Sequence, residues 1–130
     1  MKLIDTNIFL ELFLGQKKAA ECGAFLQKVA DGGDRAVVTS FTLHACEALL
    51  GKPKLISEFI RNIVNSSGLT VYETTRDDEL SVSLLMEHVS LDFDDALQYF
   101  VCKKLGINFI VSFDRDFNGL DIKRIEPTKS

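Results

Sequence analysis

The chain has 130 residues, of which 46% are hydrophobic and 26% are charged, and its formal net charge is −4. This length indicates one domain over residues 1–130, large enough to bury a core without disulfide bonds. No apolar run approaches the roughly 20 residues that a membrane-spanning helix needs. The acidic balance argues against a protein that binds nucleic acid through a broad basic surface.

The amino terminus and the cysteines indicate a cytoplasmic protein. The first residues, MKLIDTNIFLELFLG, are apolar behind one lysine, but acidic residues and Asn7 interrupt them and no small-residue cleavage site follows. The three cysteines are widely spaced and form no C-x-x-C pair, which argues against a disulfide framework or a zinc site. We expect Cys22, Cys46 and Cys102 to be small core residues.

Apolar runs alternate with helix signals along the chain. The first half predicts a strand at Lys2–Asp5, helices at Ile8–Phe13 and Lys17–Ala30, a strand at Ala36–Val38, and a helix that Thr39 or Ser40 caps and that continues to Leu50. The second half predicts a helix at Pro53–Asn65, a strand at Leu69–Tyr72, helices from Thr75 to about Val89 and from Asp92 to Leu105, and strands at Asn108–Ser112 and Ile122–Ile125. Short apolar strands between helices are typical of an α/β fold with a mostly parallel sheet covered on both faces.

Acidic residues gather at the predicted carboxyl edge of this sheet, where such folds bind their ligands. Asp5 ends the first strand, and Asp114 follows the strand Asn108–Ser112. Asp95 lies in the first turn of the helix that leads into that strand, so it belongs at the same edge. Glu47 is less well placed, because it lies about two turns, or roughly 10 Å, into its helix.

Each acid also has a simpler interpretation. Asp5 begins a loop or caps the next helix, and Asp92 is a natural N-cap. Asp95 complements the helix dipole, a stabilisation of about 0.3–1 kcal/mol. Asp114 and Asp116 are common turn residues. The convergence of these acids on one edge favours a shared function instead.

Carboxylates this close together need a counter-charge. At an effective dielectric of 20, one pair at 4 Å costs about 4 kcal/mol. Hard divalent cations relieve this repulsion, and ligation by oxygen alone favours magnesium or manganese over zinc. Such ions activate water and stabilise charge on a phosphodiester. The sequence therefore predicts a site for Mg²⁺ or Mn²⁺.

The chain resembles the PIN domain and, within that family, the VapC-type toxins of toxin–antitoxin pairs. Four segments carry the resemblance, namely Leu3–Asn7, His44–Leu49, Phe93–Leu97 and Val111–Phe117, and residues 122–127 fit the last strand of the family. The resemblance implies a PIN-like three-layer α/β/α sandwich. It also implies a magnesium-dependent endoribonuclease that hydrolyses RNA.

The resemblance assigns roles to seven polar residues. It implies that four acids bind the metal and are catalytic, namely Asp5, Glu47, Asp95 and Asp114. Asp116 is implied as an auxiliary acid that also binds the metal, and Asn7 and Ser112 as supporting residues. The family more often has Thr at the position of Ser112 and small residues where this chain has Gln98-Tyr99-Phe100. Asp92 and Asp94 stay open as alternatives to Asp95.

The resemblance also implies partners. Proteins of the VapC type pair with a second copy and are silenced by a small antitoxin. The predicted helices Ile8–Phe13 and Pro53–Asn65 are rich in apolar residues, which favours an interface; the alternative is that both segments fill the core. The alternative function is a non-catalytic or RNA-processing PIN-fold module. A phosphohydrolase with an aspartyl nucleophile is disfavoured, because position 7 is Asn rather than an acid.

Overall fold

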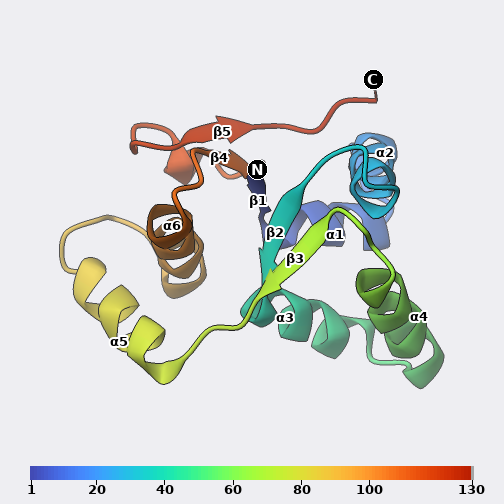
Figure 1. Ribbon diagram of the computed structural model, residues 1–130, viewed down its shortest axis with the longest axis horizontal. Helices are drawn as coiled ribbons and strands as arrows, with labels where there is room; N and C mark the ends of the chain where they lie inside the picture. Colours follow the sequence, from blue (N-terminus) through green and yellow to red (C-terminus); the bar gives the residue numbers. More distant parts are fainter. Residues whose placement is uncertain (130) are drawn as a thin grey trace.

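Strands and helices alternate along the chain in the computed structural model, which describes residues 1–129 (Figure 1). The strands are β1 (Lys2–Ile4), β2 (Ala36–Thr39), β3 (Leu69–Tyr72), β4 (Phe109–Val111) and β5 (Lys123–Ile125). The helices are α1 (Thr6–Phe13), α2 (Ala19–Ala30), α3 (Ser40–Leu50), α4 (Pro53–Val64), α5 (Arg76–Leu85) and α6 (Phe93–Leu105), with a short 3-10 helix, η1 (Arg115–Phe117), after β4.

The strands form one five-stranded sheet in the order β3-β2-β1-β4-β5, and each neighbouring pair is parallel. The central strand β1 pairs with β2 on one side and with β4 on the other. Its register against β4 aligns Leu3 with Ile110 and Ile4 with Val111. The carboxyl ends of β1 and β4 therefore meet at the same point of the edge.

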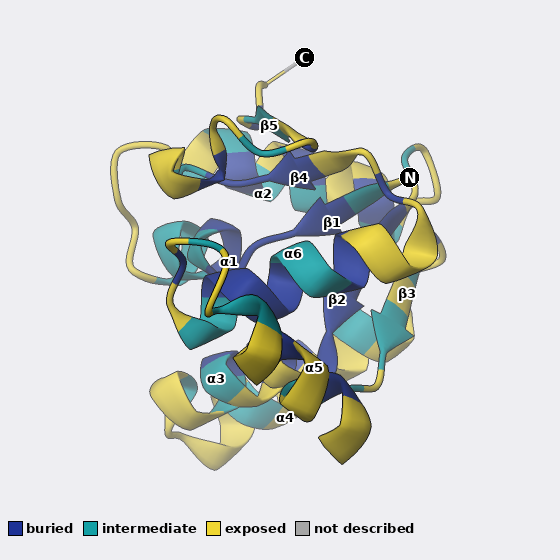
Figure 2. Cartoon of the chain, turned by 90° about the vertical axis from the view of Figure 1, so that its left-hand side faces the viewer, coloured by how far each residue is buried: buried dark blue, intermediate teal, exposed yellow. Residues whose placement is uncertain are grey.

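Helices cover both faces of the sheet, as the sequence predicts. In Figure 1, α1 to α4 lie on one side of the sheet, and α5 and α6 lie on the other. Successive residues of a strand pack on opposite faces of the sheet. Ile4 and Val111 belong to one core cluster, and Leu3 and Ile110 belong to another. This two-sided burial explains why these strands are continuous apolar runs. Figure 2 shows β1, β2 and β4 as the buried centre of the molecule.

Several of the predicted capping residues are found at helix ends in the structure. The side chain of Thr39 accepts a hydrogen bond from the N–H of Thr42, and Thr75 forms a capping box with Asp78. At Gly106, which follows α6, φ is 69°, a left-handed conformation that glycine adopts without strain. None of the helices in residues 1–129 is long and apolar enough to cross a membrane.

Three predicted helix ends differ from the structure. Helix α1 begins at Thr6, before the predicted Ile8, and α2 begins at Ala19, because Lys18 occupies its N-cap position. Helix α5 ends at Leu85, and the chain continues in a turn to about Val89, where the sequence predicts more helix. Terminal turns of this kind are decided by packing more than by local propensity.

Asp78 links α5 to β3 and α6. Its buried carboxylate accepts hydrogen bonds from the Tyr72 hydroxyl at 2.8 Å, the Lys104 ammonium at 2.9 Å and the N–H of Thr75 at 3.1 Å. Burial opposes its ionisation, but these hydrogen bonds outweigh that effect and lower its pKa to about 2. This network is structural, and it shares no residue with the acids at the sheet edge.

The apolar residues of α1 and α4 divide between core and surface. Phe9 and Phe59 are buried and pack edge to face, with ring centroids 5.9 Å apart. Leu14, Leu55 and Ile60 stay exposed, at 57%, 42% and 42%. The two segments therefore fill the core in part and leave some apolar surface uncovered.

A prediction follows from the turn before β3. A Cβ added to Gly68 would lie 2.2 Å from the Asp34 carbonyl oxygen and 2.6 Å from that of Val29. We expect Gly68→Ala to lower the free energy of unfolding by roughly 2–3 kcal/mol, measured by urea denaturation, because these backbone atoms must move. Gly23→Ala is the matched control inside α2, where the new Cβ would lie 3.5 Å from Leu12. It should stabilise by about 0.5–1 kcal/mol, and equal effects of the two changes would contradict this account.

Candidate metal centre

Asp5 lies where β1 ends and α1 begins, but its side chain does not cap the helix. Its Oδ2 accepts a hydrogen bond from the Ser112 hydroxyl at 2.5 Å, and its Oδ1 accepts one from the Gln98 amide at 2.9 Å. The side chain is only 3% exposed. The carboxylate is therefore held by Ser112, after β4, and by Gln98 on α6, while Asp5 itself occupies the N-cap position of α1.

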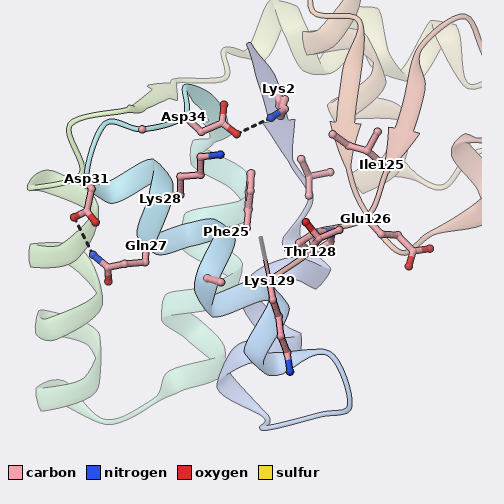
Figure 3. Close-up of a pocket in the computed structure, with 14 residues that line it drawn as sticks. Lys2, Phe25, Gln27, Lys28, Asp31, Asp34, Ile125, Glu126, Thr128 and Lys129 are labelled. Atoms are coloured by element: carbon pink, nitrogen blue, oxygen red, sulfur yellow. Dashed lines mark hydrogen bonds and ion pairs between the residues drawn. The ribbon is translucent and has the colours of Figure 1, made fainter.

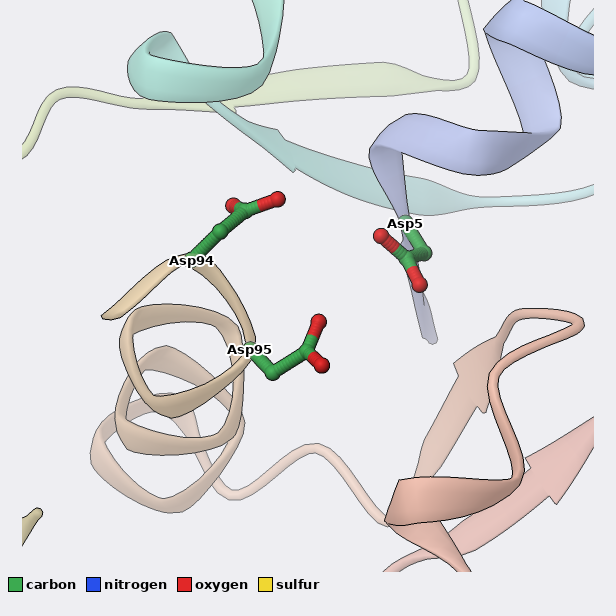
Figure 4. Close-up of side chains that lie close together, drawn as sticks. All are labelled: Asp5, Asp94 and Asp95. Atoms are coloured by element: carbon green, nitrogen blue, oxygen red, sulfur yellow. The ribbon is translucent and has the colours of Figure 1, made fainter. Parts of the chain in front are cut away.

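The first turn of α6 brings two more carboxylates to Asp5. Asp92 caps the helix by accepting the N–H of Asp95 at 2.9 Å, which leaves the Asp94 and Asp95 side chains free for other contacts. One oxygen from each of Asp5, Asp94 and Asp95 lies within 4.8 Å of the others. Figure 4 shows the carboxylates of Asp5 and Asp95 facing each other across the edge of the sheet.

A second group extends the cluster toward the loop after β4. One carboxylate oxygen from each of Asp95, Asp114 and Asp116 also lies within 4.8 Å of the others. Asp114 has a turn role as well, since its Oδ1 accepts the N–H of Asp116 at 2.9 Å. Asp95 belongs to both groups and so joins them. We call Asp5, Asp94, Asp95, Asp114 and Asp116 the acidic cluster.

Burial and mutual repulsion shift the titration of this cluster. Burial raises the pKa of Asp5, with a smaller contribution from the charge of Asp114. Burial and the charges of Asp5 and Asp92 raise the pKa of Asp94 to about 6. The pKa of Asp95 rises to about 8 through burial, a hydrogen bond with Asp114 and the nearby negative charges. The cluster therefore keeps protons at pH values where isolated carboxyl groups would be ionised.

Ser112 and Asn7 lie at the centre of the cluster. The Ser112 hydroxyl donates to Asp5 and accepts the N–H of Asp114 at 2.9 Å. The Asn7 amide donates to the same hydroxyl at 3.4 Å, and its Oδ1 accepts the N–H of Phe113 at 3.4 Å. One serine therefore connects the end of β1 to the loop that carries Asp114.

Glu47 is the predicted acid that neither group contains. It lies on α3 and is half-exposed. Its charge, together with that of Asp94, adds to the effect of burial in raising the pKa of the Cys46 thiol to about 12. Its role in metal binding stays a prediction from the family resemblance.

In the sequence, Gln98 stands out only as a departure from the family pattern. In the structure its Nε2 donates to Asp5 at 2.9 Å and to Asp94 at 3.2 Å. The available signal was its spacing, because residues four apart on a helix lie on the same face. Asp94 and Gln98 have this spacing, so their side chains lie on the same face of α6.

The donor set fits a hard divalent cation. Carboxylate oxygens dominate it, with a serine hydroxyl and an asparagine amide beside them. Magnesium and manganese prefer such oxygen ligands, whereas zinc in proteins prefers nitrogen and sulfur. The raised pKa values of Asp94 and Asp95 indicate negative charge without a positive partner, which a bound cation would neutralise.

A surface hollow of about 640 Å³ lies apart from this cluster (Figure 3). It is lined by α2 and by the segment after β5, including Phe25, Ile125 and Lys129. An ion pair between Lys2 and Asp34, at 2.6 Å, lies at its margin. Its lining contains no member of the acidic cluster, so it is not the metal centre.

The repulsion gives a testable prediction for Asp95→Asn. The folded-state pKa of Asp95, about 8, lies above its ordinary value of 3.8, so this group destabilises the metal-free fold increasingly as pH rises through that interval. With chelator at pH 8, thermal melts should show a higher midpoint for the variant, by about 2–5 °C, and a smaller gain at pH 5. Asp116→Asn, at the exposed rim, is the control and should shift the midpoint less. A lower midpoint for Asp95→Asn at pH 8 would refute this account of the repulsion.

Comparisons with known proteins agree with this geometry. The model of the PIN domain family matches residues 2–123. The structure is similar to that of Mycobacterium tuberculosis VapC20, a toxin that cleaves the sarcin–ricin loop, with a TM-score of 0.73 and 20% identity over 98% of this chain and 100% of that one. It is also similar to a chain in a toxin–antitoxin complex from Klebsiella pneumoniae, with a TM-score of 0.67 and 19% identity over the whole of both chains.

No protein with a curated description matches the sequence significantly. The two structural likenesses establish the fold, because their identities are low. The family match covers nearly the whole chain and confirms the resemblance that the motifs around Asp5, Asp95 and Asp114 indicate. The chain therefore belongs to the PIN domain family.

Proposed function

We propose that this chain is a metal-dependent endoribonuclease that hydrolyses RNA phosphodiester bonds, as a single PIN domain over residues 1–130. The observation that carries the proposal is the convergence of carboxylates from β1, α6 and the loop after β4 on one edge of a PIN fold. These acids come from distant parts of the sequence and repel one another. A fold that nevertheless holds them together at a cost to its own stability has the character of a functional site.

Mg²⁺ or Mn²⁺ is the proposed cofactor. Asp5, Asp95 and Asp114 are the proposed ligands, because Asp95 lies near Asp5 in one group of carboxylates and near Asp114 in the other. Asp116, in the second group, is the auxiliary acid. The family resemblance adds Glu47 to the catalytic set. Asn7 and Ser112 support the ligands by hydrogen bonds, and the spacing also admits Asp94 as a ligand.

The chemistry is a hydrolysis. When bound, the cation activates water and stabilises the negative charge that develops on the phosphodiester. Side chains of the chain orient the proposed metal ligands by hydrogen bonds. Ser112 and Gln98 orient both oxygens of Asp5, and Ser112 also holds the backbone of Asp114. Arg115 is exposed next to Asp114 and can contact the phosphates of the substrate.

We predict that cleavage of a defined RNA requires Mg²⁺ or Mn²⁺ and stops in excess chelator. Asp5→Asn should reduce the rate at least about 100-fold, because it removes a ligand charge from the reacting centre while it preserves shape. Asp77→Asn is the matched control, since Asp77 is an exposed acid on α5 outside the cluster. It should cleave at the unaltered rate. Full cleavage in chelator, or near-normal cleavage by Asp5→Asn, would refute the proposal and favour a non-catalytic PIN-fold module.

We further propose that the chain is the toxin of a toxin–antitoxin pair and forms a homodimer. The Klebsiella pneumoniae relative is part of a toxin–antitoxin complex, which supports an antitoxin partner here. An arginine on such a partner would suit the acidic cluster, because it binds carboxylates bidentately. The exposed Leu14, Leu55 and Ile60 offer apolar contacts for either partner.

The partner proposal predicts that the tagged chain, purified from its native host, is a dimer by light scattering at micromolar concentration. A small copurifying protein should be encoded next to the gene and should inhibit RNA cleavage when it is added back. A monomer without such a protein would contradict the toxin assignment. The nuclease proposal would survive that outcome, because it rests on the acidic cluster and the PIN fold.

We place the protein in the cytoplasm. Its proposed substrate is found there, and its cysteines, Cys22, Cys46 and Cys102, are free and buried. Unpaired thiols are usual in proteins of reducing compartments.

A further inference from the structure

Gln98 occupies an unusual place for an uncharged side chain. It lies on α6, is fully buried with 0% exposure, and its Nε2 contacts two carboxylates of the acidic cluster. The partners are Asp5, at 2.9 Å, and Asp94, at 3.2 Å. An amide nitrogen has two protons, so each acid receives one.

The contact to Asp5 gives that carboxylate a second side-chain donor. Ser112 donates to Oδ2, and Gln98 donates to Oδ1. With one donor on each oxygen, the plane of the carboxylate is set from two sides. The same amide also donates to one oxygen of Asp94, so a single group contacts two acids that repel each other.

The oxygen of the Gln98 amide, in contrast to its nitrogen, forms no hydrogen bond that would fix the orientation of the amide. Among the described residues, Gln98 Oε1 is a buried oxygen without a hydrogen-bond partner. Leaving a buried acceptor without a hydrogen bond is unfavourable. Turning the amide over would place this oxygen against two carboxylates and would remove both donors from them. The acids therefore fix the orientation of the amide, and the fold tolerates the unpaired oxygen as a consequence.

We propose that Gln98 is a positioning residue that sets the orientation of Asp5 and Asp94 and thereby the affinity of the acidic cluster for a divalent cation. The inference rests on the proposed function, which supplies the cation. Groups that orient metal ligands by hydrogen bonds typically change metal affinity by 10–100-fold when they are removed. Gln98 donates such hydrogen bonds to Asp5, a proposed ligand, and to Asp94, which lies one turn before it on α6.

The test measures Mn²⁺ binding to the full chain by isothermal titration calorimetry. Gln98→Leu removes the amide and keeps a similar volume, and Gln98→Met is a second apolar variant that adapts more easily to the cavity. Both should bind Mn²⁺ about 10–100-fold more weakly than the unaltered chain. Far-UV circular dichroism and thermal melts in chelator show that each variant is folded.

The control separates positioning from general loss of structure. Asp78→Asn weakens a buried polar network that shares no residue with the acidic cluster. It should lower the melting midpoint but leave Mn²⁺ affinity within about twofold, since the cluster keeps all its partners. This contrast would support a positioning role, because simple destabilisation would weaken binding in both kinds of variant.

The outcomes distinguish the inference from the proposed function. If Gln98→Leu and Gln98→Met bind Mn²⁺ within about twofold of the unaltered chain, the positioning role is overturned and the metal site stands. Equal weakening in Asp78→Asn would also overturn it. If the unaltered chain binds no Mn²⁺, the proposed metal-dependent function fails, and the inference fails with it.

Discussion

The parallel pairing of β1 with β4 is the constraint on which the rest of the site depends. Its register sets Ile4 opposite Val111, and the N–H of Asp5 continues the pairing by donating to the Val111 carbonyl at 3.0 Å. Asp5 and Ser112 consequently leave the sheet side by side and form a hydrogen bond of 2.5 Å. A shift of one residue in this register would turn Asp5 to the other face of the sheet.

The acidic cluster opposes the stability of the fold that carries it. Burial and like charges raise the pKa values of Asp94 and Asp95 to about 6 and about 8, so part of the negative charge is unfavourable near neutral pH. The apolar layers on both faces of the sheet supply the stability that offsets this cost. A divalent cation would reverse the sign of the local electrostatics, which is why metal binding, stability and activity are expected to change together in this protein.

Local signals in the sequence predicted much of the fold. Thr75 and Asp78 predicted the start of α5, and Gly106 predicted the end of α6. The rule that parallel sheets bind ligands at their carboxyl edge brought Asp5, Asp95 and Asp114 together, although they are far apart in the chain. These rules could not predict the contacts of Gln98, because the contacts depend on how α6 packs against the end of β1.

The central claim is that the edge of the sheet formed by Asp5, Asp95 and Asp114 binds a divalent cation. Anomalous scattering from crystals grown with Mn²⁺ tests it most directly, because it locates the ion without reference to activity. The account predicts a peak between these carboxylates, with oxygen ligands at about 2.0–2.2 Å, near the distance range of Mg²⁺ sites. An ordered crystal in saturating Mn²⁺ with no peak at this edge, or with a peak only elsewhere on the molecule, would contradict it.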